Sequence, residues 1–121
     1  ISSTTRVAWD TMFFDGAFGK PLTQEAAGED YAQVLEALHR APSARNMQPW
    51  RVVRRAGERA WDFYVHEYGF FARVDIGIGM ADWEMACEDL KLPGHWAVLT
   101  DVPADAAVPE NTAYVITWLQ D

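Results

Sequence analysis

Apolar residues recur at helical spacing in two stretches of this chain. In residues 29–40, the residues that share one helical face are Tyr31, Val34, Leu35 and Leu38. In residues 75–91, they are Ile76, Met80, Trp83, Cys87 and Leu90. Positions three and four residues apart lie on the same side of an α-helix. Both stretches are therefore predicted to be helices that pack one face against a core.

Four shorter stretches are predicted to be strands. Residues 50–55 and 60–67 are joined by a short turn around Gly57, and this link is too short for a crossover, so the two strands should pair antiparallel. Residues 95–100 form a third predicted strand, with a buried-looking pattern. Residues 113–119 are apolar on both faces, so this fourth strand is expected inside a sheet or under a partner.

The apolar residues of the segment before the first predicted helix follow neither helical nor strand spacing. Residues 6–14 are expected to form a short irregular or one-turn helical arm with Phe13 and Phe14 buried, and residues 1–5 are polar and expected to be flexible. Two main helices and about four strands in mixed order predict an α+β fold with a mixed sheet. The length fits one domain spanning residues 1–121.

Glycines occupy two positions inside the second predicted helix, Gly77 and Gly79. Each costs about 1 kcal/mol relative to alanine in a helix. The usual compensation is a close approach of the backbone to another element or to a ligand. We therefore expect this part of the helix to touch something closely.

Composition narrows the classes of partner. The formal net charge of −8 argues against nucleic acid, because phosphate binding needs clustered cations. No apolar run approaches the roughly 20 residues that span a bilayer, so no membrane association is expected. The single cysteine, Cys87, forms no intrachain disulfide and fits a cytoplasmic protein. The one local group of cations is interpreted as a solvated face, and it comprises Arg51, Arg54, Arg55 and Arg59.

The residue types of metal and nucleophile sites are sparse. The three histidines, His39, His66 and His95, show no ligand spacing with one another or with Cys87, so no metal site is expected. Cys87 lies on the apolar side of a predicted helix, where burial disfavours a reactive thiolate. Side-chain catalysis is therefore not indicated.

The stretch between the first helix and the hairpin, Ala41–Trp50, has neither helical nor strand periodicity. Pro42 and Pro49 each fix their own φ and push the preceding residue toward extended geometry, so the helix cannot continue. The polar side chains of this loop are Ser43, Asn46 and Gln48. A hydroxyl and two amides suit neutral recognition of a planar polar ligand. The alternative is that Ser43 and Asn46 simply bond neighbouring backbone.

The loop sequence resembles a known family. Ala-Pro-Ser-Ala-x-Asn-x-Gln-Pro-Trp-Arg at residues 41–51 is similar to the signature loop of the FMN-dependent nitroreductases. Residues 9–16, residues 21–23 and residues 75–90 resemble the second half of those family members that are built from two tandem halves. The resemblance runs from about residue 6 to residue 119, and the loop is its specific part.

This resemblance implies a nitroreductase-like half-domain that takes part in an FMN site. It implies that Pro42, Ser43, Ala44 and Asn46 lie against FMN, that Ser43 and Asn46 hydrogen-bond it, and that Gln48 helps to hold the loop. In such an enzyme the flavin carries electrons from NAD(P)H to a small nitro or quinone-like acceptor, so no catalytic side chain is expected. The family also implies a site shared across a dimer.

One feature departs from the family pattern. Typical members open with an arginine-rich segment that binds the FMN phosphate, whereas here only Arg6 precedes the first helix. The opening matches the second tandem half, and the chain starts without methionine, so the phosphate-binding residues are expected in an N-terminal half of a longer product or in a homodimer partner. The alternative is a non-catalytic half-domain that acts in dimerisation or in flavin or ligand binding.

Overall fold

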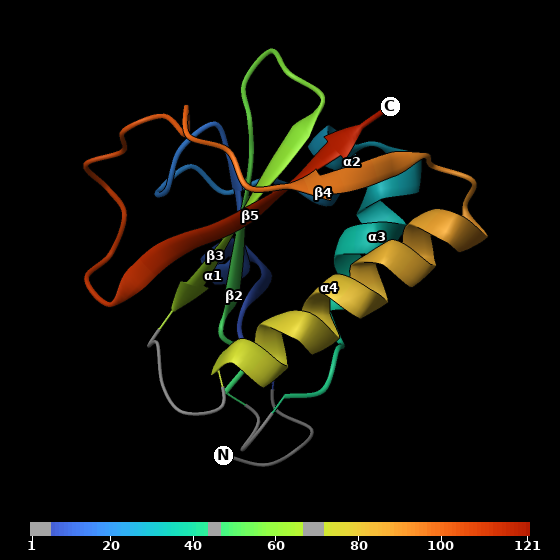
Figure 1. Cartoon of the computed structure of the whole chain (residues 1–121), viewed down its shortest axis with the longest axis horizontal. Helices are drawn as coiled ribbons and strands as arrows, with labels where there is room; N and C mark the ends of the chain where they lie inside the picture. The colour runs from blue at the N-terminus through green and yellow to red at the C-terminus, as the bar shows by residue number, and fades with distance from the viewer. Residues whose placement is uncertain (1–5, 44–46, 67–71) are drawn as a thin grey trace.

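The computed structural model describes residues 6–43, 47–66 and 72–121. Five strands form one mixed sheet in the order β1-β2-β3-β5-β4, in which β1 and β2 pair parallel and the other neighbours pair antiparallel (Figure 1). The elements in chain order are α1 (Trp9–Met12), β1 (Phe13–Asp15), α2 (Gln24–Ala27), α3 (Glu29–His39), β2 (Trp50–Arg54), β3 (Ala60–His66), α4 (Ala72–Asp89), β4 (Gly94–Ala97) and β5 (Thr112–Gln120). The predicted α+β class and the antiparallel hairpin are confirmed.

The extra strand comes from the N-terminal arm. This arm contains the expected single helical turn and buries Phe13 and Phe14, but its end continues as β1 and pairs with β2. Arg54 donates from Nε and Nη2 to the carboxylate of Asp15, which stands opposite it in the register. The described sheet thus has one strand more than the approximately four predicted, because three residues are too few to show a strand period.

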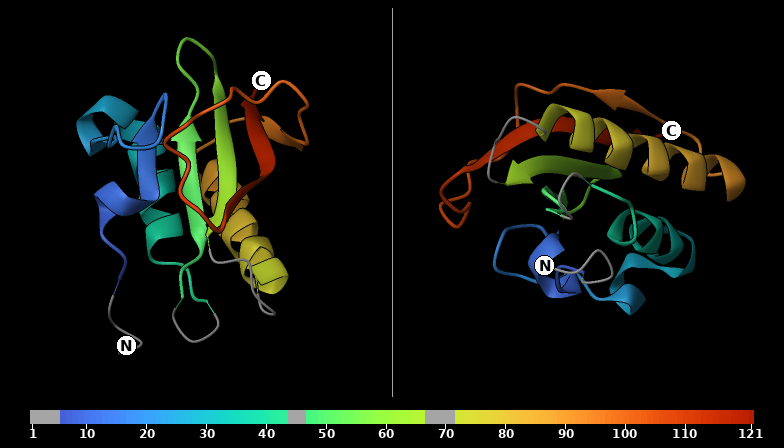
Figure 2. Two further views of the ribbon diagram at one scale, coloured as in Figure 1. Left: turned by 90° about the vertical axis from the view of Figure 1, so that its left-hand side faces the viewer. Right: turned by 90° about the horizontal axis from the view of Figure 1, so that it is seen from below.

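The two main helices cover one face of the sheet. Figure 2 (left) shows α3 and α4 behind the strands and the long β4–β5 loop in front of them. The helix face buries the main core, to which α3 contributes Tyr31, Val34, Leu35 and Leu38 as predicted. Three fully buried tryptophans, Trp50, Trp61 and Trp83, lie in the same core.

Helix α4 begins at Ala72, three residues earlier than predicted, so Asp75 lies buried in its first turn. The predicted close approach is confirmed for Gly79, where an added Cβ would lie 3.0 Å from Cε3 of Trp50. At Gly77 the same atom would meet nothing within 4 Å. One glycine thus lets α4 pack against β2, and the other faces open space.

The two predicted C-terminal strands differ in position. β5 lies between β3 and β4, inside the sheet, as its two apolar faces predicted. β4 is an edge strand that ends at Ala97, and Val98 is 71% exposed. The strand predicted over 95–100 is present, but it ends three residues earlier and is not buried. As an edge strand it has a neighbour on one side only.

Candidate functional site

The loop Ala41–Trp50 is fixed at both ends. Ala41 is buried against the end of α3, where its N–H donates to the carbonyl of Leu38 at 3.0 Å. At the other end, the carbonyl of Pro49 accepts a hydrogen bond from the N–H of His66 at 2.7 Å, and Trp50 is fully buried at the start of β2. The loop therefore spans a short gap between two elements that are packed in the core.

Gln48 organises the described part of the loop from inside. Only 1% of this residue is exposed, and its φ of 48° is in the left-handed region that most residues avoid. Its N–H donates to Oγ of Ser43 at 2.7 Å, and its Oε1 accepts from the N–H of Val7 at 2.8 Å. Its carbonyl accepts from Nη1 of Arg51 at 2.8 Å. These bonds offset the backbone cost and tie the loop to the segment before α1.

The predicted site residues fall into three groups. Pro42 is exposed and Ser43 is half-buried, whereas Gln48 points into the protein. Ala44 and Asn46 lie outside the described residues. Ser43 uses its oxygen as an acceptor, and within residues 6–43, 47–66 and 72–121 its hydroxyl proton has no acceptor. The loop thus offers at least one hydrogen-bond donor.

Two guanidinium groups lie near the start of the loop. Nη2 of Arg6 is 3.4 Å from the carbonyl of Arg40, which directly precedes Ala41. Arg40 is itself exposed and makes a weak ion pair with Glu36 at 3.8 Å. The segment before α1 therefore places a second cation beside the loop, which the sequence did not reveal.

The interpretation of the arginines around β2 as a solvated face was wrong. Arg59 is exposed, but Arg51 and Arg55 are buried, and Arg55 is 5% exposed. Nε of Arg55 donates to Oδ2 of Asp62 at 2.9 Å, and Oγ1 of Thr117 donates to Oδ1 of Asp62 at 2.6 Å. An aspartate within an apolar strand was the available sequence signal for this ion pair.

The ion pair is covered by the long loop between β4 and β5. Tyr114 Oη lies 2.7 Å from Oγ1 of Thr117 and accepts from the N–H of Leu99 at 3.0 Å. Burial alone would lower the pKa of the Arg55 guanidinium, but its hydrogen bond to Asp62 and the charge of that carboxylate raise this pKa above its ordinary value. Arg55 therefore stays charged, and the cluster serves to attach the loop to the sheet.

Nucleophile and metal chemistry find little support in the described residues. Burial raises the pKa of the Cys87 thiol to about 11, so this side chain is a neutral thiol at pH 7. In the part of the chain that the structure describes, no group of three His, Cys, Asp or Glu side chains could hold a metal ion. The described helices also include none with the length and apolar character needed to cross a bilayer.

No model of a protein family matches this chain, and no curated protein matches it.

Proposed function

We propose that this chain is a nitroreductase-like half-domain of an FMN-dependent oxidoreductase and that the loop Ala41–Trp50 supplies part of the flavin site. The observation that carries the proposal is the conformation of the two described parts of the loop, residues 41–43 and 47–50. Gln48 holds it from inside through Ser43 and Val7, while Pro42 and Met47 are exposed at its surface. Loop residues that are fixed in advance, as these are, lose little conformational entropy when a planar ligand binds.

The donor set fits one part of such a ligand. The Ser43 hydroxyl is available to donate to a carbonyl or nitrogen of an isoalloxazine ring, and Pro42 offers a rigid apolar surface. Two cations among the described residues, Arg6 and Arg40, lie near the loop start. This set fits half a site, in which a homodimer partner or an N-terminal half adds the remaining phosphate-binding residues.

Bound FMN would supply the redox chemistry between NAD(P)H and a small nitro or quinone-like acceptor. The residues of this chain would bind and orient the ring. Ser43, together with Asn46 from the resemblance, would hydrogen-bond its polar edge, and Gln48 would keep the loop in place. Such a protein would act in the cytoplasm without nucleic acid or membrane partners.

The first test is the visible absorption spectrum of the purified, concentrated protein before and after addition of FMN and removal of the excess. A bound flavin band supports the proposal. The double substitution Ser43→Ala with Asn46→Ala should weaken FMN binding, because each lost neutral hydrogen bond is worth about 0.5–1.5 kcal/mol.

Two variants control this experiment. Thr100→Ala changes an exposed residue outside the loop and should leave FMN binding unchanged. Trp50→Ala should lower the melting temperature first, because this side chain is fully buried. Unchanged FMN retention in the double variant, with its fold intact, would remove the loop from the site.

A non-catalytic half-domain is the second candidate function. The exposed apolar side chains of α4 favour it, since Val74 is 61% exposed and Met85 is 60% exposed on the side of the helix away from the core. Such a surface is typical of association with another chain. A sample that stays colourless after FMN addition would support this candidate over the enzyme.

A further inference from the structure

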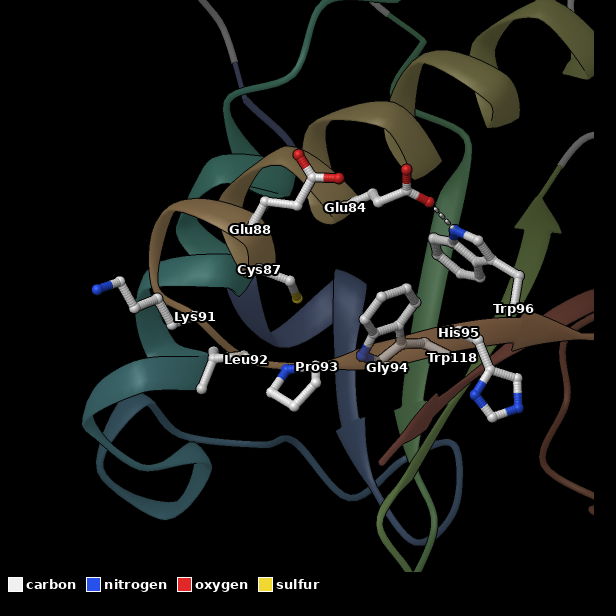
Figure 3. A pocket seen from close by; sticks show the side chains of 10 residues that line it. All are labelled: Glu84, Cys87, Glu88, Lys91, Leu92, Pro93, Gly94, His95, Trp96 and Trp118. Atoms are coloured by element: carbon white, nitrogen blue, oxygen red, sulfur yellow. Dashed lines mark hydrogen bonds between the residues drawn. The ribbon is translucent and has the colours of Figure 1, made fainter.

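A pocket of about 810 Å³ opens between the C-terminal half of α4 and the edge strand β4. Figure 3 shows it at the end of α4 where the chain turns into β4, and none of its lining residues belongs to the loop Ala41–Trp50. Its size is in the range of pockets that hold small organic molecules. The pocket is formed by described residues of this chain, so its ligand can be considered separately from the flavin proposal.

Two indole rings form the apolar wall. Trp96 and Trp118 contact each other edge to face, with ring centroids 5.0 Å apart. The ring of Trp118 lies across Gly94, where an added Cβ would be 2.4 Å from Cζ2 of the indole. Trp118 donates from Nε1 to Oη of Tyr31 at 3.0 Å. The wall is therefore held rigidly by the sheet and by α3.

Carboxylates border the same wall. Nε1 of Trp96 donates to Oε1 of Glu84 at 2.9 Å, which fixes the orientation of this half-buried ring. Glu88 follows one helical turn later, and within the described part of the chain its carboxylate makes no hydrogen bond or ion pair. Figure 3 shows the carboxylates of Glu84 and Glu88 on the same side of α4, with the ammonium of Lys91 directed away from the tryptophans. The pocket thus combines aromatic faces with negative charge.

We propose that this pocket binds an organic ammonium ion that carries an aromatic or branched apolar group. Tryptophan has the aromatic face that attracts cations most strongly, and the apolar part of the ligand would pack against the two indoles. Glu88 would pair with the ammonium group, and Glu84 would hold Trp96 in position. The overall charge of −8 also favours a cation over an anion.

The test uses three probes that share one ring and differ in charge: 2-phenylethylammonium, 2-phenylethanol and phenylacetate. Binding is followed by the indole N–H resonances of Trp96 and Trp118, with the Trp96 signal identified from Trp96→Phe. We expect the cation to bind about two- to fivefold more tightly than the alcohol, and phenylacetate to bind most weakly. Added salt should weaken binding of the cation and leave that of the alcohol unchanged.

Charge variants assign the effect to this pocket. Glu88→Gln should lower affinity for 2-phenylethylammonium about two- to fivefold and leave 2-phenylethanol unchanged. Lys91→Gln should raise affinity for the cation. Glu110→Gln makes the same charge change in the β4–β5 loop, outside the residues that line the pocket, and should alter neither affinity.

Several outcomes would overturn the proposal. One is that the three probes bind equally well, and another is that phenylacetate binds best. Absence of binding at millimolar concentrations would also overturn it, as would binding that leaves the Trp96 and Trp118 resonances unshifted. Because no flavin takes part in these measurements, their failure would leave the FMN proposal standing.

Discussion

The two faces of the sheet are covered by different means. On one face, α3 and α4 bring apolar stripes onto Trp50, Trp61 and Phe63. The other face is covered by loops, and beneath them lie a small apolar cluster around Tyr64 and the Arg55–Asp62 ion pair (Figure 2). Helices bury area through periodic apolar residues, whereas the loops here are attached through single polar contacts.

This difference indicates on which face of the sheet the protein should tolerate amino-acid substitutions. Apolar packing is spread over many contacts, so a volume-conserving substitution on the helix face should cost little. A buried ion pair concentrates its effect in two groups, and loss of either leaves the other buried charge without its nearest partner. The loop-covered face should therefore respond most strongly to a single polar substitution.

The largest expected effect is on the loop-covered face. Asp62→Ala removes the carboxylate that accepts from both Arg55 and Thr117, and leaves a buried guanidinium. We expect a loss of about 3 kcal/mol in the free energy of unfolding, measured by urea denaturation.

The double variant Arg55→Met with Asp62→Leu separates charge from packing. It removes both members of the pair and should be clearly more stable than Asp62→Ala. If Asp62→Ala is nearly neutral, the ion pair does not stabilise this face and the contrast between the two faces disappears.

Alkaline pH should lower the stability of the folded protein through groups on both faces of the sheet. Burial raises the pKa of Tyr31 and of Tyr64 to about 12, and that of Cys87 to about 11. These folded-state values lie above the unfolded ones, so the native state retains protons that the unfolded chain loses. Stability should therefore be complete below about pH 9 and fall between about pH 9 and pH 12, by a few kcal/mol in total.

Two substitutions divide this alkaline loss between the faces. Cys87→Ala should remove the part that begins near pH 9 on the helix face. Tyr64→Phe should remove part of the loss above pH 10 on the loop-covered face, with little change at pH 7 because no hydrogen bond of the Tyr64 hydroxyl is present among the described residues. Thermal unfolding of each variant across pH 7–12 gives the decrease in melting temperature with pH. If this decrease is the same in the wild type and both variants, these assignments are contradicted.

The smallest expected effects are two opposite ones within α4. Gly79→Ala places a methyl group 3.0 Å from the ring of Trp50 and 3.1 Å from Cδ1 of Leu38, and should cost about 1 kcal/mol after the gain in helix propensity. Gly77→Ala enters open space and should stabilise the protein by about 0.5–1 kcal/mol. Chemical denaturation of the two variants gives the sign of each change in the free energy of unfolding. If both changes have the same sign, α4 does not pack on β2 as described.

The sequence predicted the elements whose patterns are local. Both main helices and the β2–β3 hairpin follow from apolar spacing and a short turn. β1 escaped detection because its strand character comes from pairing with β2, far along the chain. Arg55 looked solvated because the loop that covers it is contributed by residues after β4. Contacts between distant segments leave no periodic signal.

The candidate site was predictable to a similar extent. Two prolines and a buried tryptophan defined the limits of the loop from sequence alone. The inward position of Gln48 depends on a hydrogen bond to Val7, and the position of Arg6 depends on the carbonyl of Arg40. Both are contacts between the N-terminal segment and the loop region, and neither segment indicates them by itself.

The position of β5 between β3 and β4 has a consequence for how the protein reaches its folded state. β3 and β4 have no pairing with each other, so the sheet remains two separate pieces until Thr112–Gln120 joins them. During synthesis, α3, β2 and β3 emerge from the ribosome well before that strand. Until then, the edge of β3 that pairs with β5 remains unpaired. Non-local pairing of this kind slows folding, and exposed strand edges invite association with other chains. The open edge of β3 should therefore be exposed to such association until β5 has been synthesised.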